Sequence, residues 1–287
     1  MSEIILSSTY FGNDTPTELE EVLIDAKTFD VDGFEVGSTH MNCSNPHALI
    51  TKHIGDRKIF THNYFPAPVE PFVLNIASQN GALRKRSVDF AVNALKFADQ
   101  VDAIFYTLHP GFLSDPEIPG NDRNNFDFDF SHHVIGSEDS AFELMIDSLT
   151  EIINRSKDNS VKLLIESEGS LTNPGVSLLE KPSQYQKLFK IFGADIGINL
   201  NVAHSYFSSV FFQYDLKKFL AEVKDHIKAC ELSHNDKLND LHLPFSKQSY
   251  ILEFLGCLPD CPRILEFRRA TKQQIIDSVE LIRSLAD

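Results

Sequence analysis

Residues 230 to 242 hold the densest set of side chains in this chain that could perform chemistry. Two imidazoles, His234 and His242, and two carboxylates, Asp236 and Asp240, fall within nine residues, directly after an apolar segment typical of a strand. Asp240 and His242 are two residues apart, so an extended backbone would place both on one face. Neutral imidazole together with carboxylate suits a divalent metal such as zinc, manganese or iron. A solvated polar loop would carry the same residues, so the rest of the sequence has to decide between the two interpretations.

The composition is that of a globular chain of 287 residues, 42% hydrophobic and 23% charged. Barrels of alternating strands and helices commonly occupy about 250 residues as one domain, and we expect residues 1–287 to form a single domain. No run of about 20 apolar residues predicts a membrane span. The start of the chain lacks the basic and apolar regions of a signal peptide. The four cysteines form no metal-finger pattern. We therefore expect a cytoplasmic protein with reduced thiols.

The charge balance bears on the class of partner. The formal net charge is −15, and the clearest basic cluster is Arg84-Lys85-Arg86. Phosphate contacts from basic residues supply much of the affinity for nucleic acids. A small molecule is therefore favoured as the ligand and nucleic acid is the less favoured partner, although a local basic patch could suffice. The sequence leaves the oligomeric state open, a homo-oligomer included.

Short apolar or β-branched segments recur along the chain, and most are followed by a helical pattern. Eight of them end near residues 9, 36, 62, 109, 166, 201, 234 and 266. This repeat predicts an α/β fold, a single (β/α)8 TIM barrel. An open doubly wound sheet is the alternative, but no Gly-x-Gly-x-x-Gly follows a strand. Thr15 and Ser140 each open a capping-box pattern, so helices are expected to begin there.

Residues 112–138 break the pattern. They hold two prolines, a polar run and an alternation of Phe and Asp, without the period of a helix or a buried strand. We expect a long inserted loop after the fourth strand. Loops of this length are usually functional or disordered, so the segment is a candidate lid.

Metal-capable side chains follow the predicted strands. Active sites of such barrels lie at the C-terminal ends of the strands. From the third strand onward, every strand end offers a suitable group: His62, His109, Glu166, Asn201 with His204, His234 with Asp240 and His242, and Glu266. Each of these residues alone could be structural. Chance burial of so many would be costly, because an unpaired charge in a barrel mouth needs a partner. A metal site accounts for the whole set.

Several short sequence motifs occur in this order: Asp32-Gly-Phe-Glu-Val, Thr61-His-Asn-Tyr, Leu74-Asn-Ile-Ala-Ser, Leu108-His-Pro-Gly, Leu164-Ile-Glu-Ser-Glu-Gly, Asn201-Val-Ala-His-Ser, Ser233-His-Asn-Asp and Ile264-Leu-Glu. In their order and spacing the chain resembles the xylose-isomerase-like TIM barrels, which include sugar isomerases, sugar epimerases and endonuclease IV. The resemblance covers nearly the whole chain and implies the barrel fold. It does not specify the reaction.

The resemblance also implies metal ligands. The three-zinc pattern of endonuclease IV falls on His62, His109, Glu166, His204, His234, Asp240, His242 and Glu266. The single metal of the sugar epimerases would fall on Glu166, Asn201, His234 and Glu266. Both patterns have Asp where this chain has Asn201, and an amide adds no negative charge. We therefore expect one or two divalent ions (Mn, Zn, Co or Mg) rather than three, with Glu166, Asn201, His234, Asp240, His242 and Glu266 as ligands.

Three functions follow from these residues. The first is a metal-dependent isomerase or epimerase of a sugar or sugar derivative, in which the metal polarises a carbonyl and Glu166 and Glu266 transfer the proton. Its expected substrate-binding residues are His62, His109, His204, Asp236 and Arg268. The alternative is an endonuclease IV-like apurinic endonuclease, a zinc-dependent phosphodiester hydrolase. The third is a non-catalytic sugar-binding barrel, which Asn201 alone supports.

Overall fold

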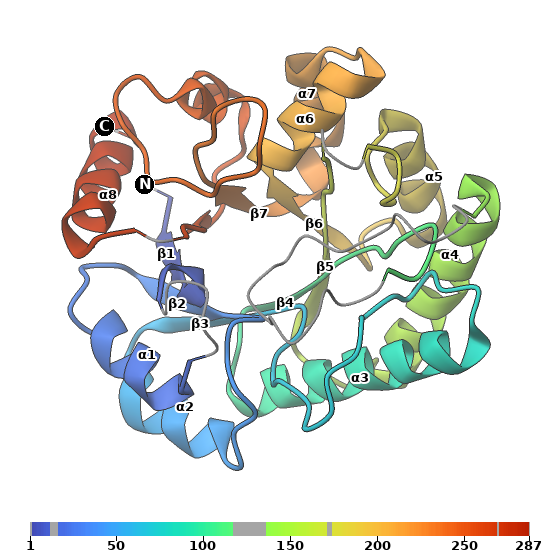
Figure 1. Ribbon diagram of the computed structural model, residues 1–287, viewed down its shortest axis with the longest axis horizontal. Helices are drawn as coiled ribbons and strands as arrows, with labels where there is room; N and C mark the ends of the chain where they lie inside the picture. The colour runs from blue at the N-terminus through green and yellow to red at the C-terminus, as the bar shows by residue number, and fades with distance from the viewer. Residues whose placement is uncertain (1, 12–16, 117–135, 171–173, 269, 287) are drawn as a thin grey trace.

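The computed structural model describes residues 2–11, 17–116, 136–170, 174–268 and 270–286. Its centre is a closed barrel of eight parallel strands, each paired with its neighbours in chain order (Figure 1). The strands are β1 Ile4–Ser7, β2 Gly33–Val36, β3 Lys58–His62, β4 Phe105–Leu108, β5 Lys162–Glu166, β6 Gly197–Asn201, β7 Ile227–Leu232 and β8 Arg263–Leu265. Pairing of β1 with β8 closes the ring. The predicted (β/α)8 barrel is confirmed.

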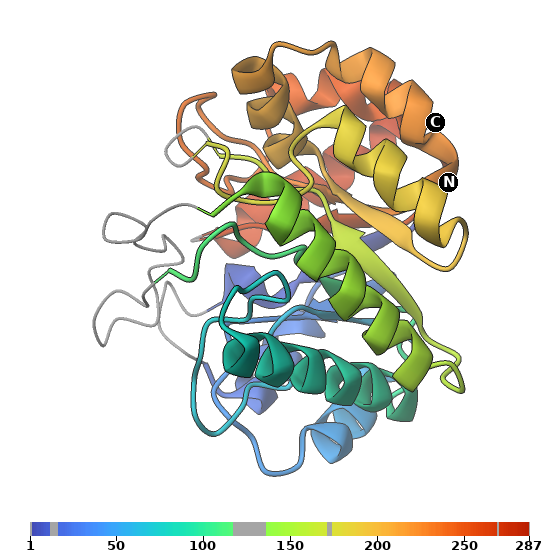
Figure 2. The ribbon, with the colours of Figure 1, turned by 90° about the vertical axis from the view of Figure 1, so that its right-hand side faces the viewer.

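Helices surround the barrel, and Figure 2 shows α3 and α4 along its outside. The α-helices are α1 Leu19–Ala26, α2 Pro46–Ile54, α3 Gly81–Gln100, α4 Glu138–Arg155, α5 Pro182–Phe192, α6 Val202–Phe212, α7 Leu216–Val223 and α8 Lys272–Ala286. The described residues also form the 3-10 helices η1 Ser8–Tyr10, η2 Lys224–His226 and η3 Tyr250–Cys257. No helix in the described part of the chain is long and apolar enough to span a membrane.

Two predicted helix starts were wrong. Thr15 lies outside the described residues, but helix α1 begins only at Leu19, because the backbone of Thr17 pairs with Thr39 and Met41 instead of entering a helix. Helix α4 begins at Glu138, two residues before the expected cap at Ser140. For α1 the start is set by pairing with residues 39–41, which a local capping pattern does not contain.

The interior of the barrel explains where the polar residues lie. Five apolar side chains form a small cluster inside it: Ile5, Phe60, Leu164, Ala229 and Ile264. Side chains on a strand alternate between faces, so the residue two positions further on points to the same interior. Those residues are Ser7, His62, Glu166, Glu231 and Glu266, all buried. A layer of polar groups therefore covers the apolar layer at the C-terminal mouth of the barrel.

The insertion predicted at residues 112–138 has two described ends that lie together. Leu113 donates its N–H to Val176, and Gly136 donates to the carbonyl of Leu113. Phe112 also forms an isolated bridge with Ser177. Residues 117–135 lie outside the described residues, and with them most of the predicted lid.

Candidate active site at the barrel mouth

Three residues from neighbouring strands form what we call the inner group: His62, His109 and Glu166. His62 ends β3, Glu166 ends β5, and His109 directly follows β4. One carboxylate oxygen, Glu166 Oε2, lies 2.8 Å from His62 Nε2 and 3.0 Å from His109 Nε2. The other ring nitrogen of His109 lies 2.6 Å from Glu168 Oε1. The strand ends thus bring two imidazoles onto one carboxylate oxygen.

A second set, the outer group, consists of His204, Asp240 and His242. His204 lies in the first turn of α6, whereas Asp240 and His242 come from the loop after β7. Asp240 Oδ2 lies 3.0 Å from His204 Nε2 and 2.9 Å from His242 Nε2. The loop is folded back by two backbone hydrogen bonds between His234 and Leu243. This pairing places Asp240 and His242 beside helix α6.

One contact connects the groups, because His204 Nδ1 lies 3.5 Å from Glu166 Oε1. On the other side of the outer group, His242 Nδ1 lies 3.1 Å from Glu266 Oε2, after β8. Gly169 permits the close packing behind them, because a Cβ atom there would lie 2.0 Å from the carbonyl oxygen of His204. Imidazoles and carboxylates thus alternate across the barrel mouth, from the end of β3 to the residue after β8.

Asn201 is fully engaged in hydrogen bonds. Its amide nitrogen donates to Glu166 Oε1 at 3.1 Å and to Glu231 Oε2 at 3.0 Å. Its amide oxygen accepts the backbone N–H of His204 and so caps helix α6. An Asp at this position could not donate, and it would place a third carboxylate beside Glu166 and Glu231. The neutral amide therefore holds the two acidic side chains together.

Two buried acids in this layer were missed by the sequence prediction, Glu231 in β7 and Glu35 in β2. Burial and the nearby Glu166 and Glu266 raise the pKa of Glu231 well above its ordinary value. Burial raises the pKa of Glu35 to about 7, although His62 opposes the shift. The signal for Glu231 was a charge between the apolar residues Cys230 and Leu232, two residues after Ala229.

The charges in the two groups stabilise one another. Burial opposes charge on His62 and His109, but Glu35 and Glu166 raise the pKa of His62, and Glu166 and Glu168 raise that of His109 well above its ordinary value. The pKa of Glu166 is correspondingly lowered, because the two imidazoles outweigh its burial.

The outer group follows the same rule. Burial works against the charged form of both imidazoles, yet Asp240 raises the pKa of His204 to about 9 and that of His242 to about 10. The same contacts overcome burial and lower the pKa of Asp240. Contact with His242 outweighs burial and lowers the pKa of Glu266 to about 2. Protons on the histidines therefore neutralise the carboxylates, as a bound cation would.

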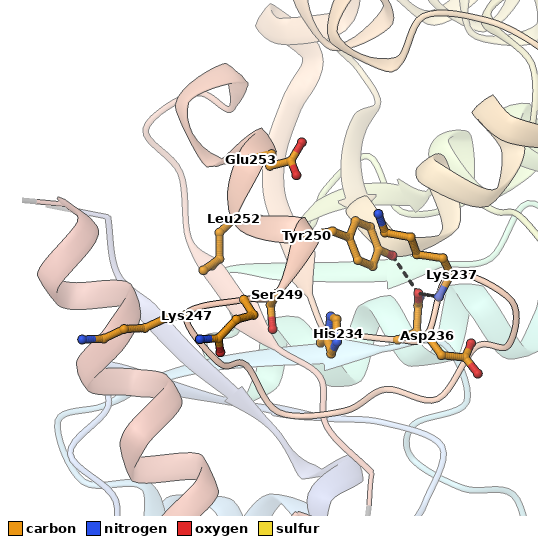
Figure 3. Close-up of a pocket in the computed structure, with 10 residues that line it drawn as sticks. His234, Asp236, Lys237, Lys247, Ser249, Tyr250, Leu252 and Glu253 are labelled. Atoms are coloured by element: carbon orange, nitrogen blue, oxygen red, sulfur yellow. Dashed lines mark hydrogen bonds between the residues drawn. The ribbon is translucent and has the colours of Figure 1, made fainter.

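The remaining predicted residues lie further out. His234 and Asp236 line a separate pocket of about 620 Å³ between the β7 loop and η3 (Figure 3). The carboxylate of Asp236 accepts the backbone N–H groups of Leu238 and Asn239. Arg268 donates its backbone N–H to the carbonyl of His242. The structure thus does not bring His234 into either three-residue group.

Each group fits a divalent metal by its donors. In both, three ligand atoms lie within 4.8 Å of one another. Two histidines and a carboxylate suit zinc, manganese or iron, and three protein ligands leave a position for substrate, as in catalytic zinc sites. His204 Nδ1 and His242 Nδ1 are buried and face carboxylates without making hydrogen bonds within the described part of the chain. These features fit ligands that a cation would join.

Residues 25–284 match the xylose isomerase-like TIM barrel family, and the chain belongs to that family. A D-tagatose 3-epimerase-like protein has a similar structure, with a TM-score of 0.72 and 18% identity over 99% of this chain and 97% of that one. Endonuclease IV from Thermus thermophilus superposes with a TM-score of 0.62 and 12% identity, over 99% and 98% of the two chains.

Sequence relatives match over shorter stretches. The probable endonuclease 4 of Aquifex aeolicus (strain VF5) is 49% identical over 41 residues, which are 14% of each chain. An uncharacterized protein of Methanocaldococcus jannaschii is 25% identical over 179 residues, 61% of this chain. The matches cover 14% and 57% of the length of these two curated relatives, less than two thirds in each case.

Proposed function

We propose that the protein is a metal-dependent isomerase or epimerase of a sugar or sugar derivative. The observation that carries the proposal is the alternation of carboxylates and imidazoles across the mouth, with Glu166 at one end and Glu266 at the other. Both carboxylates are buried, and the pKa of each lies below its ordinary value because neighbouring imidazoles outweigh the effect of burial. Two ionised, fixed carboxylates are suited to proton transfer on the two faces of a substrate.

The residues have distinct roles in this reaction. The inner and outer groups would hold the metal, which polarises the substrate carbonyl and acidifies the neighbouring C–H. One carboxylate, Glu166 or Glu266, removes the proton from that carbon. The other takes a proton from water and delivers it to the carbon or to its neighbour, and the first carboxylate releases its proton to water. Glu168 orients the imidazole of His109 through its contact with Nδ1.

Features of the chain outside the catalytic groups also support a small substrate. The pocket beside the outer group has a volume of about 620 Å³, within the range of small-molecule sites. The net charge of −15 disfavours a polyanion. A structural relative carries the name D-tagatose 3-epimerase-like, and sugar epimerisation is the chemistry that we transfer to this chain.

Hydrogen exchange in D₂O tests the proposal. The manganese- or zinc-loaded protein is incubated with D-tagatose, D-fructose and related ketoses, and deuterium next to the carbonyl is followed by NMR. We expect incorporation that is lost in Glu166→Gln and Glu266→Gln but kept in Glu222→Gln, a control at an exposed residue of α7. A protein that exchanges no proton in any ketose, ketose phosphate or sugar acid would contradict the proposal.

A second function, apurinic endonuclease activity, is favoured by one observation. Two adjoining groups of three ligands resemble the paired metal sites that clamp phosphodiesters during hydrolysis. The test is incubation of the zinc-loaded protein with duplex DNA that contains an abasic site. Clean nicking that Glu266→Gln abolishes would establish this function in place of the isomerase.

A further inference from the structure

The pocket beside the outer group contains polar atoms that lack partners. Asn235 is 1% exposed, and its amide oxygen accepts the hydroxyl of Tyr250 at 2.8 Å and the backbone N–H of Lys237 at 3.0 Å. Its amide nitrogen is buried and has no hydrogen-bond partner among the described residues. The Nδ1 atom of His234 is likewise buried and unpartnered within that part of the chain. Because the oxygen of Asn235 is fixed by two donors, its N–H₂ group remains for a ligand.

The charge next to these atoms is positive. The Lys237 ammonium lies 5.0 Å from the ring centre of Tyr250 and forms no ion pair with a carboxylate in the described part of the chain. The carboxylate of Asp236 is held by its own loop, and Figure 3 shows it directed away from His234. The Glu253 side chain is exposed at the rim. The inner wall of the pocket thus offers hydrogen-bond donors and a cation.

We propose that this pocket is an oxyanion subsite that binds the phosphate or carboxylate group of the sugar substrate. The ligand oxygens would accept hydrogen bonds from the amide N–H₂ of Asn235 and from the Lys237 ammonium. A planar amide and an ammonium suit either anion, and the volume of about 620 Å³ leaves room for the sugar attached to it. The proposal rests on the proposed function in taking the occupant to be the substrate of the metal-binding groups.

The position of the pocket supports this link. His234 is paired through its backbone with Leu243, the residue after His242. A directly paired residue and the next one along the chain lie within about 9 Å between Cα atoms. The same loop therefore carries both the pocket and the outer group, which links the proposed anion subsite to the metal-binding residues. The subsite would select anionic sugars over neutral ones.

Calorimetric titration of the full-length protein with inorganic phosphate tests the subsite. Asn235→Asp keeps the accepting oxygen for Tyr250 and Lys237 but replaces the free donor with a negative oxygen. We expect phosphate affinity to fall at least tenfold in Asn235→Asp and several-fold in Lys237→Asn, since Asn tolerates the positive φ of 69° at that position. Lys157→Gln, at an exposed residue, is the matched control and should bind as wild type. Because Lys237 is exposed, its variant remains informative if Asn235→Asp does not fold.

Further titrations identify the source of the anion. Fructose 6-phosphate and glucuronate represent the two anion classes, and fructose is the neutral control. Either anionic sugar should bind more tightly than fructose, and this difference should disappear in Asn235→Asp. Such a result would support the subsite, and the sugar that binds more tightly would show whether its anion is a phosphate or a carboxylate. Phosphate affinity unchanged in both pocket variants would overturn it. Binding of a DNA duplex that Asn235→Asp abolishes, with no binding of small anions, would also overturn it.

The titrations do not depend on turnover. Phosphate binding without proton exchange in any sugar would contradict only the proposed isomerase activity. Proton exchange in neutral ketoses, with phosphate affinity unaffected by the pocket variants, would contradict only the proposed anion subsite.

Discussion

The inner and outer groups contain the same kinds of side chain but are held by different parts of the fold. His62 and Glu166 of the inner group lie on strands β3 and β5, whose backbones are fixed by pairing on both sides. The outer group combines the first turn of α6 with the loop after β7, and the Asp240 side chain is 32% exposed. The paired strands of the barrel therefore fix the side chains of the inner group. The side chains of the outer group depend on the conformation of the loop after β7.

The carboxylates differ in the same way. Glu166 uses both oxygens, one toward His62 and His109 and the other toward Asn201 and His204. Asp240 directs a single oxygen at both of its histidines. Loss of Glu166 should disturb both groups, whereas loss of Asp240 should disturb only the outer one. This asymmetry gives an order to the expected effects.

The largest effect is expected for Glu166→Gln. The amide cannot act as the base and lacks the charge that holds two imidazoles, so ketose exchange should fall about a thousandfold, within the usual range for a general base. Metal content should fall by one ion per chain. Exchange kinetics and elemental analysis measure both quantities. Glu222→Gln, at an exposed residue of α7 outside both groups, is the control, and its metal content should not change.

Asn201→Asp should lower the unfolding free energy of the metal-free protein. The new carboxylate would face Glu166 and Glu231 without a donor between them, and an uncompensated buried charge costs about 3 kcal/mol or more of unfolding free energy. Zinc should restore the loss, because a cation can join the three acids. Urea unfolding with chelator and with zinc measures the difference. A variant as stable as wild type in chelator would show that the amide is not holding these acids together.

The pH dependence of the free energy of unfolding should show that the histidines of the outer group are protonated in the metal-free protein. Contact with Asp240 raises the pKa of His242 to about 10 in the folded chain, although burial opposes it. This histidine therefore stabilises the metal-free fold fully below pH 6.5 and progressively less as the pH rises toward 10. Between pH 7 and 9 the loss should be about 2 kcal/mol relative to His242→Gln. Zinc replaces the proton, so zinc-loaded protein should show a flatter profile. Equal slopes with and without zinc would contradict metal binding at His242.

The smallest effect is expected for Asp240→Asn, because this carboxylate is partly exposed and serves the outer group alone. Zinc affinity of the outer group should fall at least about tenfold, the loss typical of an altered hydrogen-bond partner of a ligand, because Asp240 is itself a ligand. The inner group should keep its affinity. Competition titration with a chromogenic chelator resolves the two sites. Equal weakening of both sites would show that the groups are not separate.

Much of the fold was predictable because strands and their ends leave strong local signals. The eight apolar segments and the polar residue after most of them located the barrel and the set from His62 to Glu266. Helix α6 was not predicted, since its sequence is apolar on most sides and shows no helical period. Glu231 was missed because a charge in a strand that also carries Lys228 does not reveal which face of the strand it lies on.

The division into two groups could not be predicted from spacing. His234, Asp240 and His242 lie within nine residues of one another. In the folded loop, in which His234 pairs with Leu243, His234 lines the pocket whereas Asp240 and His242 belong to the outer group. That pairing depends on how the β7 loop packs against α6 and η3. Local sequence patterns do not contain such tertiary contacts.

Metal content of the purified, metal-loaded protein tests the central claim most directly. Two groups predict two ions per chain, with one ion lost in His109→Ala and the other lost in His242→Ala. His234→Ala should keep both. A single ion that survives both of the first two substitutions and disappears in His234→Ala would contradict the account, and so would a protein that binds no metal and is equally stable in chelator.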